Sequence, residues 1–478
     1  MGYVCSIFHV LIYKYIQIIV DNYTIRTMAS LATIGNATLL TYEGNQPILT
    51  ADPWLGEEDE AYFGSWNLTH KIPSSLKDDI FKSEYIWFSH GHPDHLNPDS
   101  LKKIKGKKIL LPDHVGGRIA SGLLNKDFIV EILPDRKWVK ISKEVSIMCI
   151  TTLIQDSILL LEVNNNLFIN LNDAGSRGAT NFIKKISKNY NKVYLLSLSG
   201  YGDADMINFY DESGDFVVPP AKNNIYVGED LSLSAKSVGA NIVIPFSSHH
   251  QYQRSDSVWA QEYITPMHAY TKGLHDDIEF IPAFVRIDCI SGKYEEIKPR
   301  PLKIEIKAPE IFGDNWSDEL DKNDTKIIDK YFQEKELISK RLGFINFVVG
   351  GKTHTTCLNK KSNKGITFTV PRSSLMKSVQ FEIFDDLLIG NFMKTTLHNM
   401  NSLYECDFNF LLTKYGDNGL AKTEAEVKKY LQEYKKRSGR QYIYDSFLAS
   451  SANILNRVLT NKSSPLRRMI KSIYYKIK

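Results

Sequence analysis

Cysteine is scarce in this chain, and the few cysteines are scattered. The 478 residues include five cysteines, at positions 5, 149, 289, 357 and 406. No two have the close spacing of a zinc knuckle, a redox pair or a Rieske iron–sulfur site. An odd number of widely separated cysteines also argues against a disulfide framework. We interpret them as buried thiols in a reducing compartment, which predicts a cytoplasmic location and excludes an internal Rieske-type electron donor.

A long uninterrupted apolar run is also missing. Residues 4–20 are largely apolar but contain His9, Lys14 and Gln17. They fall short of the roughly 20 apolar residues that a membrane span needs, and they lack the basic leader and cleavage site of a signal peptide. We expect residues 1–28 to be a leader that is not translated, with Met28 as the true start. The alternative is an anchor on a membrane surface.

Acidic residues are rare at the C-terminal end. Residues 422–478 contain 14 Lys or Arg and four Asp or Glu, so they carry a net charge of +10 in a chain of net +4. Within residues 465–478 the apolar side chains share one helical face and basic ones the other. This pattern suits an anionic membrane surface, with a helix packed on its own protein as an equal alternative. No nucleic-acid partner is expected, because no groove-reading motif accompanies the charge.

Histidine occurs only 12 times, yet three histidines gather in the run Ser89-His-Gly-His-Pro-Asp-His95. The run follows an apolar segment, residues 85–88, that reads as a buried strand. Where a strand ends and the chain turns, neighbouring side chains can converge. Imidazole and carboxylate suit zinc, iron or manganese. We expect His90 and His92 to bind one metal and Asp94 and His95 to bind a second.

This motif resembles the metallo-β-lactamase superfamily. Residues 34–40 and 48–55 are similar to the first hairpin of its ascorbate-6-phosphate lactonase-like branch, although Asn36 stands where that branch usually has histidine. The resemblance covers residues 29–290 and implies an α/β fold, the αββα sandwich. It also implies that Asp173, after the strand-like run 167–171, bridges two metals, and that His249 or His250 supplies the last ligand.

A closer similarity is to the metallo-β-lactamase-like part of CMP-N-acetylneuraminate hydroxylase. It rests on residues 198–204, on Pro245-Phe-Ser-Ser248 and on Arg254-Ser-Asp256. The superfamily usually adds a third histidine to the first metal, but residues 150–157 contain none. Asp156, Thr152 or the more remote His114 could complete that site. The resemblance therefore implies one or two divalent metals per chain, either a two-metal centre or one tight and one weak metal, most readily zinc, with iron or manganese as alternatives.

The remaining chain divides by composition. Residues 29–295 form the metallo-β-lactamase-like domain, 296–325 a linker rich in Pro, Lys, Asp and Asn, 326–421 a smaller α+β module, and 422–478 the basic helical tail. In the module we expect a helix over 327–342 and strands at 344–349, 365–371 and 379–384. Residues 385–391 read as a turn.

These features predict a metal-dependent hydrolase. A bound metal lowers the pKa of water to about 7 and polarises a carbonyl or phosphoryl oxygen, and Asp94 would orient or deprotonate the attacking water. Arg118, Arg177 and Arg254 follow motif segments, so we expect an anionic ester, lactone or phosphoester, such as a sugar derivative, with Asn36, Arg177 and Arg254 touching it. Two alternatives stay open: an iron-dependent oxidative enzyme, and a non-catalytic scaffold at a membrane surface.

Overall fold

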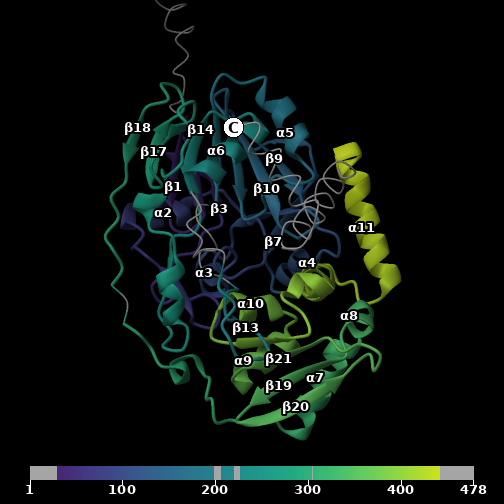
Figure 1. The fold of residues 1–478 in the computed structure, drawn as a ribbon. Coiled ribbons are helices and arrows are strands. Elements are labelled where there is room, and N and C mark those ends of the chain that lie inside the picture. Colours follow the sequence, from purple (N-terminus) through teal and green to yellow (C-terminus); the bar gives the residue numbers. More distant parts are fainter. Residues whose placement is uncertain (1–28, 199–205, 220–226, 304, 442–478) are drawn as a thin grey trace, which may run out of the picture.

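The computed structural model describes residues 29–198, 206–219, 227–303 and 305–441. Its larger part is a sandwich of two β-sheets (Figure 1). The first sheet has the order β18 (Tyr294–Glu296), β17 (Val285–Asp288), β1 (Ala29–Ile34), β2 (Thr38–Glu43), β3 (Gln46–Ala51), β5 (Tyr85–Trp87), β6 (Lys108–Pro112) and β7 (Ile129–Leu133). The second has the order β16 (Glu279–Phe280), β14 (Ile242–Pro245), β12 (Val193–Ser197), β11 (Asn166–Asn172), β10 (Ser157–Val163), β9 (Val145–Thr151) and β8 (Trp138–Lys140).

Strand β10 shows why the sandwich strands are apolar on both faces. Leu159 and Leu161 pack into the core between the sheets, against residues of the first sheet such as Leu39. Ile158 and Leu160 alternate with them and pack on the opposite face, under helices. A strand covered on both sides reads as a nearly continuous apolar run rather than an alternating one.

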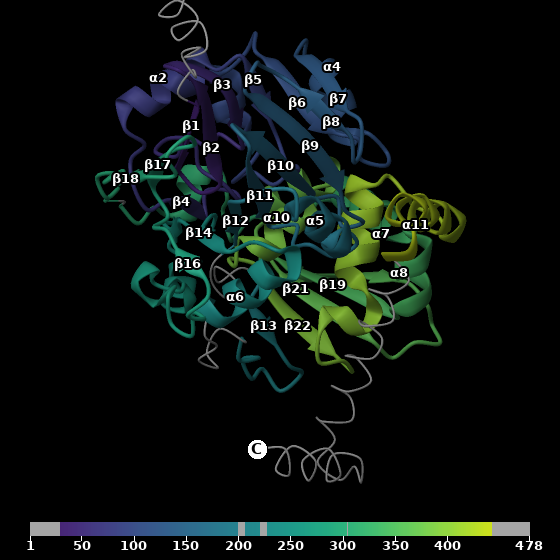
Figure 2. The ribbon, with the colours of Figure 1, turned by 90° about the horizontal axis from the view of Figure 1, so that it is seen from above.

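Helices cover the two outer faces of the sandwich. The first sheet carries α2 (Ser74–Lys82), α3 (Pro98–Lys103) and α4 (Arg118–Leu124), whose Leu76, Leu101 and Leu123 join one core cluster. The second carries α5 (Thr180–Ser187) and α6 (Val227–Val238), whose Ile183 and Leu231 join another. The layers are therefore helix, sheet, sheet, helix, which confirms the expected α/β class and αββα sandwich (Figure 2).

A third sheet lies beside the sandwich, with its own core. Its order is β13 (Phe209–Tyr210), β22 (Lys394–His398), β21 (Gly365–Thr369), β19 (Phe344–Val349) and β20 (Lys352–Cys357). Around it lie α7 (Lys322–Gln333), α8 (Glu336–Arg341), α9 (Arg372–Gln380), α10 (Phe384–Ile389), a π-helix (Phe410–Asn418) and α11 (Glu424–Ser438). Although β13 precedes α6 in the chain, it pairs in parallel with β22. We call the five-stranded sheet and these helices the C-terminal module.

Two predictions for the C-terminal module are wrong. Residues 379–384 were expected as a strand, but α9 continues to Gln380 and the following residues turn. Residues 385–391 were expected as a turn, but most of them form α10. Phe384, Leu387 and Leu388 are buried together, which is the i, i+3, i+4 spacing of one helical face. The short alternating run Val-Gln-Phe-Glu-Ile-Phe fits a strand equally well, and only burial in the module decides between the two.

The segment between the sandwich and the module runs along the sandwich. Pro301 forms a β-bridge with His70, and Lys307 forms one with Arg254, before a short 3₁₀ helix at Pro309–Phe312. At the other end, α11 starts at a capping box of Thr423 and Glu426.

The front of the basic tail is a packed helix. Val427, Tyr430 and Tyr434 of α11 are buried, whereas residues 442–478, including the amphipathic stretch 465–478, lie outside the described residues, as do residues 1–28. Within the parts of the chain that the structure describes, no helix has the length and apolar character to cross a membrane.

Candidate metal centre

The histidine motif forms a tight loop directly after β5. Asp52, at the end of β3, accepts a hydrogen bond from the Ser89 backbone at 2.8 Å. The backbone N–H groups of His95 and Leu96 both donate to the carbonyl of His92. These bonds hold the loop against the ends of the neighbouring strands, where the sequence predicted that its side chains would converge.

Each of the three motif histidines has one ring nitrogen turned toward the others and the second held by a partner. His90 Nδ1 lies 2.8 Å from the Ser89 hydroxyl, His92 Nε2 lies 2.9 Å from Asp385 Oδ2, and His95 Nδ1 lies 3.0 Å from Asp52 Oδ2. Partners of this kind fix the ring and the tautomer of a metal-binding histidine. The remaining nitrogens, His90 Nε2, His92 Nδ1 and His95 Nε2, are the ones available to a ligand.

Two groups of atoms that could hold a metal ion result, and they share Asp173. His90, His92 and Asp173 form one group, and Asp94, His95 and Asp173 form the other, with the candidate atoms of each group within 4.8 Å of one another. His90 Nε2 is 2.9 Å from His92 Nδ1, and His95 Nε2 is 3.1 Å from Asp173 Oδ2. Asp173 follows β11, as its place after a buried run suggested. The geometry brings together the donors that the sequence selected, in the expected two sets.

Of the two candidate last ligands, His250 faces the centre. It starts β15 (His250–Tyr252), which pairs with β4 (Trp66–Leu68), and its ring stacks on Trp66 at 3.5 Å between centroids. His250 lines the same cavity as Asp94 and Asp173. Both of its ring nitrogens are buried without a hydrogen-bond partner, as are those of His249, which is unusual for a polar group in a folded protein. The cavity lining, and not the missing partners, therefore distinguishes the two rings. A metal ion would satisfy one nitrogen of His250.

His249 points elsewhere. Its ring packs on Phe284 at 4.9 Å between centroids and near Tyr270, outside the cavity that His250 lines. Burial lowers the pKa of His249 to about 3, and neighbouring His70 adds to the effect. We therefore place His249 in the core and keep His250 as the candidate ligand.

Asp94 is held by two donors at the centre of the site. Its Oδ2 accepts from Asn36 Nδ2 at 2.9 Å, and its Oδ1 accepts from the Tyr62 hydroxyl at 2.5 Å. Asn36 lies in the turn between β1 and β2 and also binds the His249 backbone N–H through its Oδ1. The amide therefore orients a carboxylate, besides lining the cavity. Tyr62 was missed, because nothing in its local sequence marks it.

The three residues proposed in place of the missing histidine have different positions. Asp156 is buried and lines the cavity beside Asp173, without belonging to either metal-binding group. The Thr152 hydroxyl donates to the Asp156 carbonyl within the same turn. His114 lies behind the motif loop, 3.4 Å from the Ser89 carbonyl, and burial lowers its pKa to about 4. Of the three, Asp156 alone faces the site.

The C-terminal module supplies site residues that the sequence did not reveal. Asp385, in α10, accepts from His92 at 2.9 Å and from Lys414 at 2.9 Å, both at Oδ2. Lys414 comes from the π-helix, an element found mostly at functional sites. Burial raises the pKa of Asp385, but Lys414 and His92 outweigh it and hold that pKa well below its ordinary value. The segment around Asp385 reads as a turn in sequence, so no periodic signal pointed to it.

None of the three arginines that follow motif segments lines the main cavity. Arg254 is fully buried and pairs with Asp256 at 2.9 Å and Asp314 at 2.8 Å, so it ties the sandwich to the segment before the module. Arg118 donates to Asn418 and to the Phe381 carbonyl, which joins α4 to the module. Arg177 is exposed. Contact of Arg254 with substrate is contradicted by its burial among carboxylates, and Arg177 lies outside the cavity lining.

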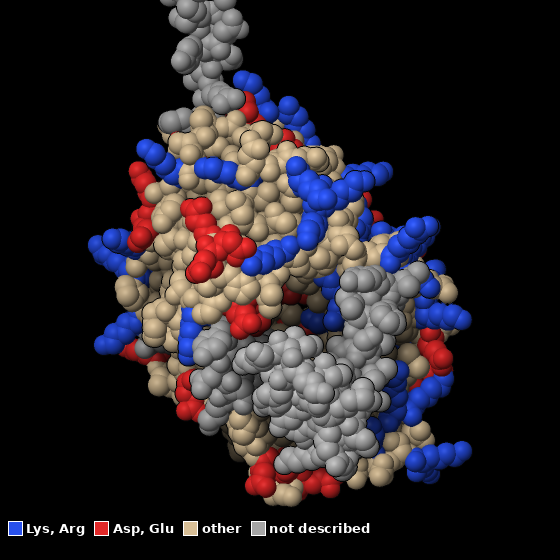
Figure 3. All heavy atoms as spheres, turned by 45° about the horizontal axis from the view of Figure 1, so that its top comes forward, with Lys and Arg blue, Asp and Glu red and all other residues tan. Residues whose placement is uncertain are grey.

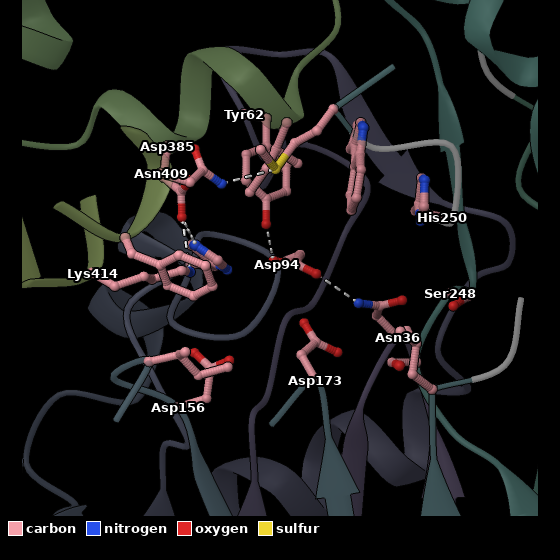
Figure 4. Close-up of a pocket in the computed structure, with 18 of the residues that line it drawn as sticks. Asn36, Tyr62, Asp94, Asp156, Asp173, Ser248, His250, Asp385, Asn409 and Lys414 are labelled. Atoms are coloured by element: carbon pink, nitrogen blue, oxygen red, sulfur yellow. Dashed lines mark hydrogen bonds and ion pairs between the residues drawn. The ribbon is translucent and has the colours of Figure 1, made fainter. Parts of the chain in front are cut away.

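A cavity of about 310 Å³ opens onto the shared carboxylates. Figure 4 shows Asp94 and Asp173 in the middle, Asn36, Ser248 and His250 on one side, and Asp385, Lys414 and Asp156 on the other. Ser247 and Ser248 have φ values of 76° and 68°, a left-handed backbone that residues other than glycine adopt at a cost. Their hydroxyls are buried without a partner. The cavity therefore has polar walls on both sides of the metal-binding atoms.

The electrostatics of the centre favour cations. Four carboxylates line the cavity (Asp94, Asp156, Asp173 and Asp385). Burial lowers the pKa of His95, but Asp94, Asp173 and Asp52 outweigh it and raise that pKa well above its ordinary value. Burial raises the pKa of Asp94 and of Asp156. Acidic groups whose pKa is raised by burial, and a histidine drawn toward protonation, are what a divalent cation would relieve. Burial instead holds the pKa of His90 well below its ordinary value, which keeps that ring neutral.

Comparisons with known proteins return the resemblance found in the sequence. No family model matches the chain. It is 28% identical over 131 residues to the cytidine monophosphate-N-acetylneuraminic acid hydroxylase of Pongo pygmaeus, across 26% of this chain and 22% of that protein. Against the inactive human form the identity is 27%, across 26% of each. The chain thus spans about a quarter of the length of the curated relatives it matches.

Part of the chain is also similar to solved structures. An isothiocyanate hydrolase from Delia radicum gut bacteria is 15% identical, with a TM-score of 0.36, across 54% of this chain and 98% of that one. A metallo-β-lactamase fold protein of Bacillus subtilis is 12% identical, with a TM-score of 0.30, across 46% and 86%. The fold assignment itself stands on the two sheets, their helix layers and the histidine loop. In sequence and in architecture, the chain is similar to the metallo-β-lactamase fold proteins.

Proposed function

We propose that this protein is a metal-dependent hydrolase acting on a small ester, lactone or phosphoester. The observation that carries the proposal is the pair of metal-binding groups that share Asp173, with the second nitrogen of each motif histidine already held by a partner. This arrangement buries polar and charged side chains, which is unfavourable for folding. The packing of the sandwich does not require them, so we attribute their burial to a metal site.

Some of these residues would bind the metals, and Asp94 would also orient a water molecule. His90, His92 and Asp173 would hold one divalent metal, and Asp94, His95 and Asp173, with His250, would hold the other. When bound, the metal supplies Lewis acidity and lowers the pKa of water. Asp94 would orient a water, because Asn36 and Tyr62 fix the direction of both its oxygens. Zinc fits the mixed imidazole and carboxylate set best, and manganese and iron fit it too.

The proposal is tested by metal content and turnover together. Protein purified without added metal should contain at least one divalent ion per chain by elemental analysis. It should hydrolyse a member of a panel of esters, lactones and phosphoesters. The His92→Ala and His95→Ala variants should lose most of that metal and the activity, but remain folded by circular dichroism. Full metal retention in both variants would contradict the assignment of the ligands.

An iron-dependent oxidative enzyme is the second candidate. The local identity to the hydroxylases favours it, as does a donor set of nitrogen and oxygen that iron accepts. Iron with a visible absorption band, together with oxygen uptake in the presence of an external reductant, would support this alternative. Zinc or manganese with hydrolytic turnover would support the first.

A further inference from the structure

The cavity has one cationic side chain among the described residues that line it, and this side chain comes from the C-terminal module. Lys414 lies in the π-helix Phe410–Asn418. On the face drawn in Figure 3, by contrast, lysine and arginine side chains are spread widely among acidic ones. A single ammonium group placed inside an otherwise acidic cavity calls for a specific role.

The ammonium of Lys414 is only partly used by the protein. Its side chain is 13% exposed and it donates to Asp385 Oδ2 at 2.9 Å. An ammonium has three N–H donors, and within the described part of the chain this is its one hydrogen bond. Buried donors are almost always paired, so the two remaining N–H groups are available to a group that enters the cavity.

Asp385 fixes where this ammonium stands relative to the metal-binding atoms. The same carboxylate oxygen accepts from His92 Nε2 and from Lys414 Nζ, and the opposite ring nitrogen of His92 faces His90. One imidazole ring and one carboxylate therefore separate the ammonium from the metal-binding nitrogen of His92. Figure 4 shows Lys414 and Asp385 on the same side of the cavity, with Asp94 and Asp173 between them and His250.

The backbone around Lys414 is a π-helix that packs against the sandwich. The N–H of Gly419 donates to the carbonyl of Lys414 at 3.0 Å, the i to i−5 bond of a π-helix. Lys414 thus lies inside an i→i+5 helix, a rare element that is frequently found at functional sites. Gly116, in the sandwich, packs so closely on this turn that a Cβ there would lie 2.8 Å from the Gly419 carbonyl oxygen. The π-helix is thus seated directly against the sandwich.

We propose that Lys414 recognises an anionic group of the substrate, a carboxylate or a phosphate, and that the C-terminal module is the specificity element of the site. The inference rests on the proposed function and deepens it, because it assigns the substrate class to a residue outside the sandwich. The sequence predicted that arginines would bind the anionic substrate, and we assign this role to Lys414 instead. The substrate is a small anion whose charged end points toward the module while its reacting bond lies over Asp94 and Asp173.

The test uses the full-length, metal-loaded protein with inorganic phosphate as the probe. Phosphate binding is measured by calorimetry for the wild type, Lys414→Met, Lys414→Arg and Lys360→Met, and metal content is measured for each. Lys360 is exposed in the module, so its variant loses the same charge away from the cavity. We expect roughly a tenfold or greater loss of affinity in Lys414→Met, since a hydrogen bond to a charged group carries that much. Lys414→Arg should recover most of it, and Lys360→Met should change nothing.

The outcomes separate the two proposals. If the wild type holds no metal, the proposed function fails. If all variants hold metal and Lys414→Met binds phosphate as the wild type does, the role of Lys414 is overturned while the proposed function stands. If Lys414→Met unfolds or loses its metal, and Lys414→Arg does so as well, Lys414 is a structural partner of Asp385 and the inference is again overturned.

Discussion

At the scale of single residues, the partners of the histidines matter as much as the histidines. Asp52 binds His95 Nδ1 at 3.0 Å and the Ser89 backbone at 2.8 Å, so it sets both the ring and the loop. Replacing it with asparagine should weaken metal binding by about 10- to 100-fold, measured by competition with a chelator. Asp99→Asn, at an exposed pair with Lys102, should have no such effect. Equal metal affinities in the Asp52→Asn and Asp99→Asn variants would show that Asp52 does not support metal binding.

A second residue-scale prediction concerns acid stability. Burial lowers the pKa of His70 to about 4, and its Nε2 accepts from the Gly35 N–H at 3.2 Å, which requires a neutral ring. Between the ordinary pKa of 6.5 and this value, the unfolded chain binds the proton and the folded one does not. Stability is therefore full above pH 6.5 and falls as the pH drops toward 4, by up to about 3 kcal/mol for this residue.

The comparison with His70→Gln isolates this effect, because glutamine keeps an acceptor but does not titrate. Denaturant unfolding at pH 7 and at pH 4.5 should show a smaller loss of stability in the variant than in the wild type. The same loss in both proteins would mean that His70 is protonated in the folded state.

At the scale of elements, strands with strong patterns were predictable and the site-forming part of the module was not. The expected strand at 344–349 matches β19 residue for residue, because a β-branched and aromatic run bounded by turns leaves few alternatives. The two-residue Asn164-Asn165 turn has the positive φ values that asparagine tolerates. By contrast, the sequences of α10 and the π-helix have no strong local pattern, and their structure depends on burial against other elements. Asp385 and Lys414, more than 290 residues from the motif they serve, could not be assigned to it from sequence.

A second prediction about elements concerns the contact between the π-helix of the module and the sandwich. Gly116→Ala places a methyl group 2.8 Å from the Gly419 carbonyl oxygen, whereas Gly117→Ala meets nothing within 4 Å. Both positions have positive φ, so the neighbouring variant controls for backbone strain. We expect Gly116→Ala to lower the unfolding free energy by about 1–3 kcal/mol more than Gly117→Ala, measured by denaturant titration. Equal losses would show that the π-helix turn moves freely away from the sandwich.

At the scale of the whole molecule, the centre lies where three parts of the chain meet. The first sheet and its loops give the histidines and Asp94, the second gives Asp173 and Asp156, and the module gives Asp385 and Lys414. Arg254, which was expected at the substrate, joins these parts instead, and so does Arg118. The sequence could bring the candidate ligands together because they follow strands of one sandwich. It could not locate the contacts between modules, because these depend on how separate cores dock.

Metal stoichiometry tests the assembled centre as a whole. His250 lies outside the group of Asp94, His95 and Asp173 but lines the same cavity, and its two ring nitrogens lack hydrogen-bond partners, so it could supply a fourth ligand to this group. His90, His92 and Asp173 have in addition only Asp156, which lines the cavity but lies outside the group. Each ion would have to be held against the repulsion of the other across the shared Asp173. Titration of metal-free protein with zinc should therefore give one tight ion and a second at least roughly tenfold weaker, a difference of about 1.4 kcal/mol.

The Asp156→Asn variant should weaken the binding of the second ion and leave the first unchanged, whereas His250→Ala should weaken the binding of the first. Two equally tight ions in the wild type would mean that Asp156 closes on the histidine pair when metal binds.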